Sequence, residues 1–430
     1  MNYLFLYLGV MLLVMVLDAR RKRRINTHHT EKLHESIESG LTEPPTLHPV
    51  VDLARCMGSG ACVKACPERA LGVVNGKAVL INAAHCIGHG ACRFACPVEA
   101  IKLVFGTEKR GVDIPNISPD FETNVPGIFI AGELGGMGLV RKAAEQGRQA
   151  IESIRKKQTA ASADFDVFIV GCGPAGVSAG LSAMEHKLRY KIVEQEDSLG
   201  GTVYHYPRQK IVMTAPVELA IIGKTKFTEV RKETLLEFWL DVVRKTGLKI
   251  SFQERMEGIE KQGDAFLVKT DKGSYTARSV LLAMGRRGTP RKLDVPGEES
   301  AKVIYRLIDP EQFKGQAVLV VGGGDSALEA AIALSEQDGT KVILSYRASA
   351  FSRVKQKNRV LLEQQQQSGR LQVLLNSSVQ RIHEQMVEIE YEGQVQEHRN
   401  DIVIVCAGGL LPKPLLEKVG IRFDTKFGTV

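Results

Sequence analysis

The sequence predicts an α/β protein in which two doubly wound, parallel-sheet units follow a small cysteine-rich α+β domain and an N-terminal apolar helix. Three observations support this prediction: two Gly-rich turns that join an apolar strand to a helix, a repeated cysteine motif, and an apolar N-terminus followed by a basic run. At 430 residues the chain is too long for one core, which suggests two to four domains.

The first 17 residues form a mostly apolar stretch, MNYLFLYLGVMLLVMVL, followed by the basic run RRKRR at 20–24. As a helix the stretch would be about 26 Å long, slightly short of a typical hydrocarbon core. A cleaved signal peptide carries its basic residues in front and ends in a small-residue cleavage site, and neither is found here. The positive-inside rule therefore predicts a single-pass transmembrane helix in the inner (cytoplasmic) membrane, with the remaining domains in the cytoplasm. An interfacial or disordered tail is the alternative.

The chain carries a formal net charge of +8, from 57 Lys and Arg against 49 Asp and Glu. A basic balance indicates nucleic acid, an anionic membrane or acidic ligands as partners. The run at 20–24 supplies five positive charges directly beside the apolar stretch, which favours a membrane partner and argues against nucleic acid.

A repeat with a period of thirty residues occupies residues 51–106 and contains six of the eight cysteines. The first copy reads CMGSGACVKACP at 56–67 and the second reads CIGHGACRFACP at 86–97. Between them a hairpin is expected around Asn75-Gly76. In a chain that faces the cytoplasm, such a cluster indicates metal binding rather than disulfides.

Both copies resemble the bacterial two-cluster ferredoxin pattern C-x2-C-x2-C-x3-C-P, except that Ser59 and His89 replace the second cysteine. The resemblance implies two iron–sulfur clusters, 4Fe-4S or 3Fe-4S, each taking one thiolate from the other copy. The first set and its neighbouring hydroxyl would be Cys56, Cys62, Cys96 and Ser59. The second set and its neighbouring imidazole would be Cys66, Cys86, Cys92 and His89. A zinc site and a degenerate fold without clusters are the competing interpretations.

The first Gly-rich turn, GCGPAG at 171–176, joins an expected strand at 166–170 to a helix. Its glycines permit a tight turn and the close approach of a pyrophosphate to the helix N-terminus. The next strand ends in Glu194, eighteen residues after the turn, where a carboxylate accepts hydrogen bonds from a ribose 2′-OH. These features predict a Rossmann-like domain with an ADP-ribose site. Its residues are Gly171, Gly173, Pro174, Ala175, Gly176 and Glu194.

A second such turn, GGGDSA at 322–327, follows the apolar run at 318–321. The next strand, at 341–344, does not end in an acid, and two arginines lie just beyond it. A missing acid with nearby arginines favours a 2′-phosphate, hence NADP(H), with NAD(H) as the alternative. The residues of this second Rossmann-like site are Gly322, Gly324, Asp325, Ser326, Arg347 and Arg353.

Residues 164–430 resemble the two-dinucleotide flavoprotein superfamily of thioredoxin reductase and thioredoxin-reductase-like ferredoxin–NADP reductase. The stretches that carry the resemblance are LGG at 199–201, LLAMG at 281–285, VPGE at 295–298 and DIVIVCAGG at 401–409. The resemblance implies FAD at the first turn, NADPH at the second, and a homodimer as the common assembly. Further implied FAD contacts are Gly200, Gly201, Thr202 and Gly285. The Cys-x-x-Cys of thioredoxin reductase is absent, and the run at 305–315 resembles the ferredoxin–NADP reductase branch instead.

Members of this superfamily close the flavin domain with a segment similar to T-x-V-P-G-I-F-A-A-G-D and a helix. In this chain the match, TNVPGIFIAGE at 123–133, precedes the first Gly-rich turn. We therefore expect a circular permutation in which residues 107–157 complete the flavin domain, with Gly132 and Glu133 contacting FAD. The expected segments are the anchor 1–17, a linker 18–50, the ferredoxin-like domain 51–106, the closing segment 107–157, the FAD domain 163–292, the NAD(P)H domain 293–400 and a return to the FAD domain 401–430.

Together these features predict an FAD-dependent NAD(P)H oxidoreductase that passes electrons between NADPH, FAD and the iron–sulfur clusters. The expected partner is a membrane-associated redox protein or a quinone-linked acceptor. The cofactors perform the redox chemistry, so no catalytic acid or base is predicted. Two alternatives remain open: reduction of a low-molecular-weight disulfide through a thiol at Cys172, and a redox-sensing scaffold that turns over slowly.

Overall fold

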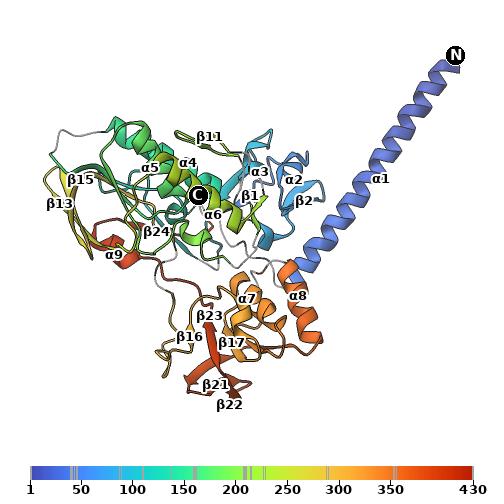
Figure 1. The fold of residues 1–430 in the computed structure, drawn as a ribbon. Helices are drawn as coiled ribbons and strands as arrows, with labels where there is room; N and C mark the ends of the chain where they lie inside the picture. Colours follow the sequence, from blue (N-terminus) through green and yellow to red (C-terminus); the bar gives the residue numbers. More distant parts are fainter. Residues whose placement is uncertain are drawn as a thin grey trace. The chain divides into compact units, whose positions relative to one another are not determined.

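The computed structural model divides the chain into two compact units, whose elements are labelled in Figure 1. The cysteine-rich unit comprises Met1–Gly111, Ala348–Val360 and Lys426–Val430, and the Rossmann unit comprises Val112–Arg347 and Leu361–Thr425. The structure describes the whole chain apart from residues 1, 39–41, 43, 45–46, 87, 89, 109–110, 137, 158–161, 207–210, 214–215, 226, 228, 287, 289, 352–353, 355 and 429–430.

The cysteine-rich unit is a small α+β fold with two similar halves. Its elements are α1 (Asn2–Glu38), β1 (His48–Val51), α2 (Ala61–Ala65), β2 (Leu71–Val74), β3 (Lys77–Leu80), η1 (Ala83–His85), α3 (Ala91–Phe94) and β4 (Ile101–Val104). β1 pairs antiparallel with β4, and β2 pairs antiparallel with β3. The β2–β3 hairpin turns at Asn75 and Gly76 with φ of 50° and 74°, so the expected Asn-Gly hairpin is confirmed.

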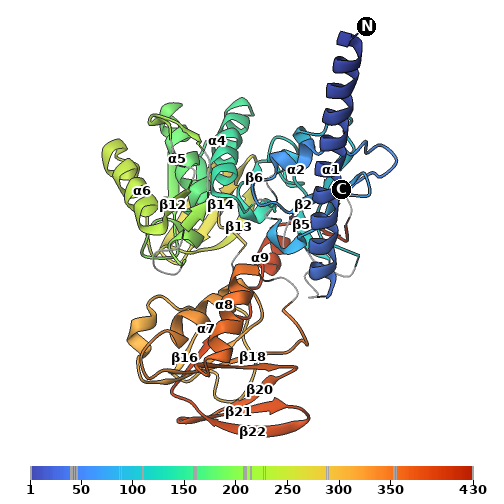
Figure 2. The ribbon, with the colours of Figure 1, turned by 90° about the vertical axis from the view of Figure 1, so that its right-hand side faces the viewer.

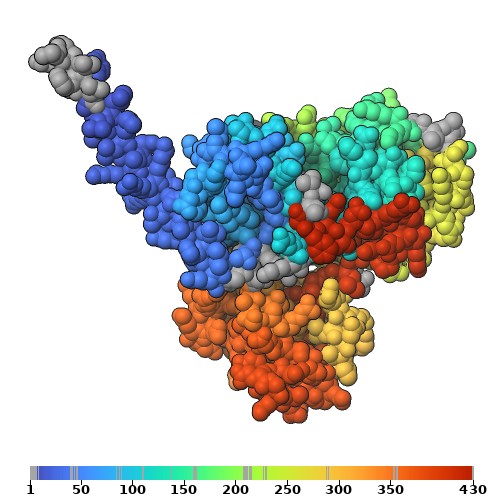
Figure 3. All heavy atoms as spheres, turned by 180° about the vertical axis from the view of Figure 1, so that it is seen from behind, coloured from blue at the N-terminus to red at the C-terminus, as the bar shows by residue number. Residues whose placement is uncertain are grey.

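The long helix α1 contacts its unit through its second half. The Asn75 amide donates to the Asn26 side-chain oxygen at 2.7 Å, and the Ser36 hydroxyl donates to the Ile81 carbonyl at 2.8 Å. Between these contacts the Val73 amide donates to His29 Nδ1 at 3.0 Å. The apolar side chains at 10–17 are exposed instead, and Figure 3 shows this part of α1 standing clear of the other side chains of its unit.

The prediction of a transmembrane helix at 1–17, and with it a single-pass inner-membrane location, is wrong. Within the part of the chain that the structure describes, no helix combines the length and the apolar character needed to cross a membrane. The physical reason is length, because about 17 residues of helix fall short of the ~30 Å hydrocarbon core before the same helix continues into the basic run at 20–24.

The first sheet of the Rossmann unit carries the first Gly-rich turn. Its strands are β6 (Ile128–Ile130), β7 (Phe165–Val170), β8 (Tyr190–Val193), β13 (Met256–Gln262), β14 (Ala265–Thr270) and β15 (Gly273–Leu282). The order is β13-β14-β15-β7-β8, with β6 also paired to β15, and β6, β15, β7 and β8 run parallel. β7 is buried along most of its length, because Val167 and Ile169 pack in one apolar cluster and Phe168 and Val170 pack in another. Figure 2 shows α4 (Val140–Lys156) beside α5 (Pro174–Glu185), which packs against β7.

The segment at 112–133 belongs to this sheet region although it precedes the first Gly-rich turn in sequence. The Ala131 amide donates to the Leu282 carbonyl at 3.1 Å, which extends the β6–β15 pairing. β5 (Val112–Pro115) pairs with β24 (Phe423–Lys426), and the Thr425 hydroxyl donates to the Asp113 carboxylate at 2.6 Å. Residues at the two ends of the Rossmann unit therefore lie side by side.

The second sheet of the Rossmann unit carries the second Gly-rich turn. Its parallel strands, in spatial order, are β16 (Val303–Ile304), β23 (Ile402–Val405), β17 (Ala317–Val321), β18 (Lys341–Tyr346) and β19 (Leu371–Leu375). A separate antiparallel sheet consists of β20 (Ser378–Ile382), β21 (Met386–Tyr391) and β22 (Gln394–Arg399). The helices of this region include η4 (Pro310–Phe313) and α7 (Asp325–Ser335). α8 (Gln356–Gln367) is divided between the two units after Val360, and α9 (Lys413–Lys418) contributes Leu416 to the core of the first sheet. The predicted pair of Rossmann-type sheets is confirmed.

The remaining elements cover the first sheet and its pocket. They are η2 (Glu133–Gly135), η3 (Gly201–Val203), β9 (Ile211–Met213), β10 (Glu218–Leu219), β11 (Gly223–Lys224), β12 (Glu229–Arg231) and α6 (Lys232–Thr246). The core of this region includes Phe129, Ile169, Leu281 and Trp239, so strands from both sides of the first Gly-rich turn share one apolar interior.

Candidate functional site

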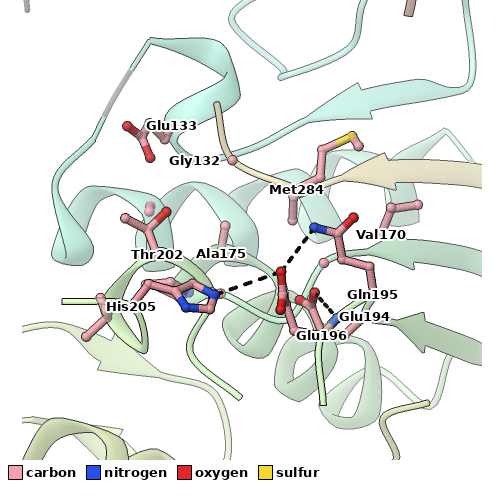
Figure 4. A pocket seen from close by; sticks show the side chains of 18 of the residues that line it. Gly132, Glu133, Val170, Ala175, Glu194, Gln195, Glu196, Thr202, His205 and Met284 are labelled. Carbon is pink, nitrogen blue, oxygen red and sulfur yellow. Dashed lines mark hydrogen bonds and ion pairs between the residues drawn. The ribbon is translucent and has the colours of Figure 1, made fainter. Parts of the chain in front are cut away.

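A pocket of about 350 Å³ lies at the carboxyl ends of the strands in the first sheet. Parallel sheets bind ligands at this edge. The predicted FAD-site residues that line the pocket are Gly132, Glu133, Gly171, Gly173, Pro174, Ala175, Glu194, Gly201, Thr202 and Gly285. In Figure 4, Glu133 and Thr202 lie on one side of the pocket, and Glu194, Gln195 and Glu196 lie on the other. The predicted Gly176 and Gly200 do not line it.

The glycines of the first turn are required by close backbone packing. Gly171 has φ of +100°, and a Cβ there would lie 2.7 Å from the Ala283 carbonyl oxygen. A Cβ on Gly176 would collide with the Gly171 carbonyl oxygen, so this glycine lets α5 start directly against β7. Pro174 occupies the first turn of α5, where its missing N–H costs no helical hydrogen bond.

Glu194 connects the first Gly-rich turn to the residues after β8 through hydrogen bonds of its carboxylate. Its side chain is 7% exposed, and its two oxygens accept hydrogen bonds from the Cys172 amide at 2.8 Å and the Glu196 amide at 3.1 Å. These bonds fix the carboxylate at the pocket wall. A carboxylate has further acceptor sites, so it can also receive the two hydroxyls of a ribose.

In the cysteine-rich unit the structure brings the six cysteines together in two sets of three. Cys56, Cys62 and Cys96 line one pocket together with Ser59, and Cys66, Cys86 and Cys92 line the other. These are the exchanged sets that the ferredoxin resemblance implies. The predicted neighbour His89 lies outside the described residues.

The surroundings of the thiols differ between the two sets, and backbone amides donate to two sulfurs of the first set. The Ala78 amide donates to Cys56 Sγ at 3.4 Å, and the Ala100 amide donates to Cys96 Sγ at 3.3 Å, which supports developing thiolate charge. Burial raises the pKa of the Cys92 thiol to about 11, with a further contribution from Cys86. A bound metal centre has the opposite effect on the pKa, because a coordinated thiol loses its proton.

Across the described residues, no group of three or more His, Cys, Asp or Glu side chains is arranged to hold a metal ion. The three thiols of each set nevertheless line a common pocket.

Residues 168–428 match the family model for pyridine nucleotide-disulphide oxidoreductases. The chain belongs to this family. Residues 48–97 match the 4Fe-4S dicluster domain. The chain is therefore an FAD-dependent NAD(P)H oxidoreductase, and its cofactors are FAD, NADP(H) and iron–sulfur clusters, as the sequence predicts.

The relatives of this oxidoreductase match it mainly over the Rossmann unit. Ferredoxin–NADP reductase of Thermus thermophilus is 31% identical over 61% of this chain and 81% of its own length. Bacilliredoxin reductase of Bacillus subtilis is 26% identical over 60% of this chain and 82% of its own length. Among solved structures, bacillithiol disulfide reductase of Bacillus cereus is 25% identical with a TM-score of 0.54, covering 60% of this chain and 82% of its own. Other ferredoxin–NADP reductases are matched over just over half of their length.

The second Gly-rich turn of this oxidoreductase connects β17 to α7. A Cβ on Gly322 would lie 2.5 Å from the Cys406 carbonyl oxygen, whereas a Cβ on Gly324 would meet nothing within 4 Å. Asp325 and Ser326 open α7. Arg347 follows β18 and is exposed, while the predicted Arg353 lies outside the described residues.

Cys172, the thiol of the disulfide-reductase alternative, is enclosed by the protein. The residue is fully buried beneath the first turn, and its thiol donates to the Ser198 carbonyl at 3.8 Å. Burial raises the pKa of this thiol far above its ordinary value, and the Glu194 carboxylate beside it raises it further. A neutral, enclosed thiol is a poor nucleophile.

Sequence reasoning missed a group of polar and charged side chains that line the pocket of the first sheet. The Arg306 guanidinium lies 3.0 Å from the His205 ring and 3.7 Å from Glu196, and the His205 ring lies 3.9 Å from Glu196 (Figure 4 shows His205 and Glu196). Arg306 lies 101 residues after His205 and none of the three belongs to a motif, so only the fold brings Arg306 to the other two. Gly147 was missed for a similar reason, since a Cβ there would collide with the Ala175 carbonyl across the α4–α5 contact.

Proposed function

We propose that the protein is an NADPH-dependent electron-transfer reductase in which FAD and the iron–sulfur clusters form one chain of carriers leading to a redox partner protein. The observation that supports this most strongly is the presence, in one polypeptide, of a flavin-nucleotide pocket and two three-cysteine pockets. When bound, FAD accepts a hydride equivalent from NADPH and releases electrons singly, which is what links a two-electron donor to one-electron clusters.

The residues of the first pocket would hold FAD by its pyrophosphate, ribose and ring. The N-terminus of α5, reached through Gly171 and Gly173, offers backbone N–H groups to the pyrophosphate. Glu194 would accept the ribose hydroxyls. Glu133, Thr202 and Gly285 converge at the other side of the pocket, because a Cβ on Gly285 would lie 4.0 Å from Glu133 Oε2 and from Thr202 Oγ1. These residues would position the flavin ring.

The residues of the second turn would hold NADPH. The N-terminus of α7, preceded by Gly324, would receive the pyrophosphate, and Asp325 and Ser326 would border it. The exposed Arg347, at the end of β18, would pair with the 2′-phosphate. NADPH is therefore proposed as the donor in preference to NADH.

We also propose that residues 112–157, which make up most of the expected closing segment 107–157, complete the FAD domain. Residues up to Gly111 belong to the cysteine-rich unit. Support comes from β6, which pairs with β15, and from Gly132 and Glu133, which line the pocket. β4 of the cysteine-rich unit ends at Val104 and β5 starts at Val112, so a short connection joins the cysteine repeat to this flavin-contacting segment.

A partner protein would take electrons at the cysteine-rich unit. Met57, next to Cys56, is 68% exposed, and Phe94, between Cys92 and Cys96, is 85% exposed. Exposed apolar side chains beside cluster ligands suit a transient redox interface. The homodimer that the superfamily resemblance implies is part of this proposal, and light scattering of the purified protein tests it.

The disulfide-reductase alternative is not favoured because its candidate thiol, Cys172, is enclosed and held neutral. Steady-state kinetics with Cys62→Ser and Cys92→Ser test the proposed carrier chain. Each variant should lose most NADPH-dependent reduction of a one-electron acceptor protein, while reduction of ferricyanide by the flavin continues. Unchanged reduction of the acceptor protein in both variants would remove the clusters from the electron path.

A further inference from the structure

One position that lines the two cysteine pockets lies outside the cysteine motif and carries different side chains in the two copies. Each copy of the repeat continues past its Cys-Pro pair, and the next residue is Glu68 in the first copy and Val98 in the second. Glu68 lines the pocket of Cys66, Cys86 and Cys92, and Val98 lines the pocket of Cys56, Cys62 and Cys96. The local backbone is the same in both, since the Arg69 and Glu99 amides each donate to the preceding cysteine carbonyl at 3.3 Å. The pseudo-symmetry therefore places a carboxylate where the other half has an apolar side chain.

The Glu68 carboxylate borders this pocket, and one of its two oxygens has no hydrogen-bond partner among the described residues. This oxygen, Oε1, is buried. A buried carboxylate oxygen without a donor or a cation is costly, so such an oxygen points to a ligand that the protein chain itself does not supply. The same pocket contains three thiols and lacks the fourth cysteine of the ferredoxin pattern.

We propose that Glu68 is the fourth ligand of the iron–sulfur cluster bound by Cys66, Cys86 and Cys92, through its buried carboxylate oxygen. The proposal rests on the cluster content of the module and not on the direction of electron flow. A carboxylate is a harder donor than a thiolate, so it binds its iron less strongly than the three cysteines bind theirs. The cluster at this set is then a four-iron cluster with one more labile iron, and the two clusters of the protein are chemically different.

The variant Glu68→Gln tests the proposal because it keeps the shape of the side chain and removes its charge. As-purified protein should lose one iron per chain, and its oxidised form should show the EPR signal of a three-iron cluster that is absent from the wild-type protein. Glu68→Asp, which keeps a carboxylate, should retain part of the four-iron cluster. Glu99→Gln, which removes an exposed carboxylate of the second copy that lines neither cysteine pocket, should leave the iron content and the EPR signals unchanged.

Two results would overturn the proposal. If Glu68→Gln keeps the wild-type iron content and EPR signals while His89→Ala produces the three-iron signal, the fourth ligand is the imidazole. If the wild-type protein already shows the three-iron signal and Glu68→Gln does not change it, the site has no fourth protein ligand. The signal of the cluster at Cys56, Cys62 and Cys96, read from the same samples, shows that the module carries clusters, so failure of this proposal is distinguishable from failure of the proposed function.

Discussion

The two Gly-rich turns of the Rossmann unit have nearly the same sequence pattern but different surroundings. At the first turn, the Glu194 carboxylate accepts hydrogen bonds from two backbone amides. Backbone atoms there also leave no space for a Cβ at Gly176. At the second turn, no acid ends β18, and Gly324 has open space around it. The difference suits a cofactor that stays bound at the first turn and a substrate that enters and leaves at the second.

The largest expected effect comes from adding one methyl group to a glycine of the first turn, and the same change at the second turn is the comparison. In Gly176→Ala the new Cβ collides with the Gly171 carbonyl oxygen, and overpacking of this kind costs roughly 1–3 kcal/mol. We expect this variant to purify with little FAD and a lowered Tm. Gly324→Ala is the matched control and should retain FAD and stability. Absorbance spectra and thermal unfolding measure both, and full FAD content in Gly176→Ala would contradict the account.

Glu194→Ala should weaken FAD binding next most strongly. The carboxylate holds the Cys172 and Glu196 amides, and a hydrogen bond to a charged group is worth about 1.5–3 kcal/mol, so we expect roughly ten- to hundredfold weaker binding. Ser345→Ala, at the end of β18 in the other sheet, should leave FAD affinity unchanged. Fluorescence titration of the apoprotein with FAD measures the effect, and equal affinities in the two variants would remove the assigned role of Glu194.

Arg347→Ala should change only the binding of NADPH, which we assign to the second turn. Loss of one charge-assisted contact to the 2′-phosphate raises the KM for NADPH about tenfold and leaves the KM for NADH unchanged. Arg381→Ala, at an exposed arginine of β20, is the control and should change neither constant. If both coenzymes are affected equally, Arg347 does not contact the 2′-phosphate.

The smallest expected effect concerns an ion pair at the start of the first sheet. Asp166 pairs with Arg189 at 2.9 Å and Arg278 at 3.2 Å. Burial by itself raises the pKa of Asp166, but the hydrogen bonds and charge of Arg189 outweigh it and hold the pKa below its usual value. A lowered pKa in the folded state means that the stabilisation is present above the unfolded pKa of about 3.9 and is lost as the pH falls through the folded pKa.

Asp166→Asn should therefore lower the free energy of unfolding at pH 7 by about 1 kcal/mol and flatten its dependence on pH on the acid side. Urea unfolding at several pH values measures this. Arg189→Met should remove most of the same pH dependence, and the double variant should add little to either. A double variant with fully additive losses would show that the two side chains act independently.

Much of this architecture could be predicted because the chemistry lies in local motifs. The GxGxxG turn, its strand and Glu194 are close in sequence, and the Asn75-Gly76 pair specifies its own hairpin. The contact of His205, Glu196 and Arg306 could not be predicted, because it joins segments about a hundred residues apart without a recurring pattern. Glu68 could not be predicted from the motif, because it follows Cys66-Pro67 and does not stand at the position of an absent cysteine, as Ser59 and His89 do. The predicted membrane anchor failed because its apolar stretch is short for a span.

An anaerobic NADPH titration of the purified protein, with flavin absorbance and cluster EPR recorded on the same samples, tests the central claim most directly. The account predicts that the flavin bleaches and that the cluster signals change in step with it, because both belong to one chain of carriers. A flavin that bleaches completely while cluster signals, present in the dithionite-reduced or oxidised protein, do not respond to NADPH would contradict the account.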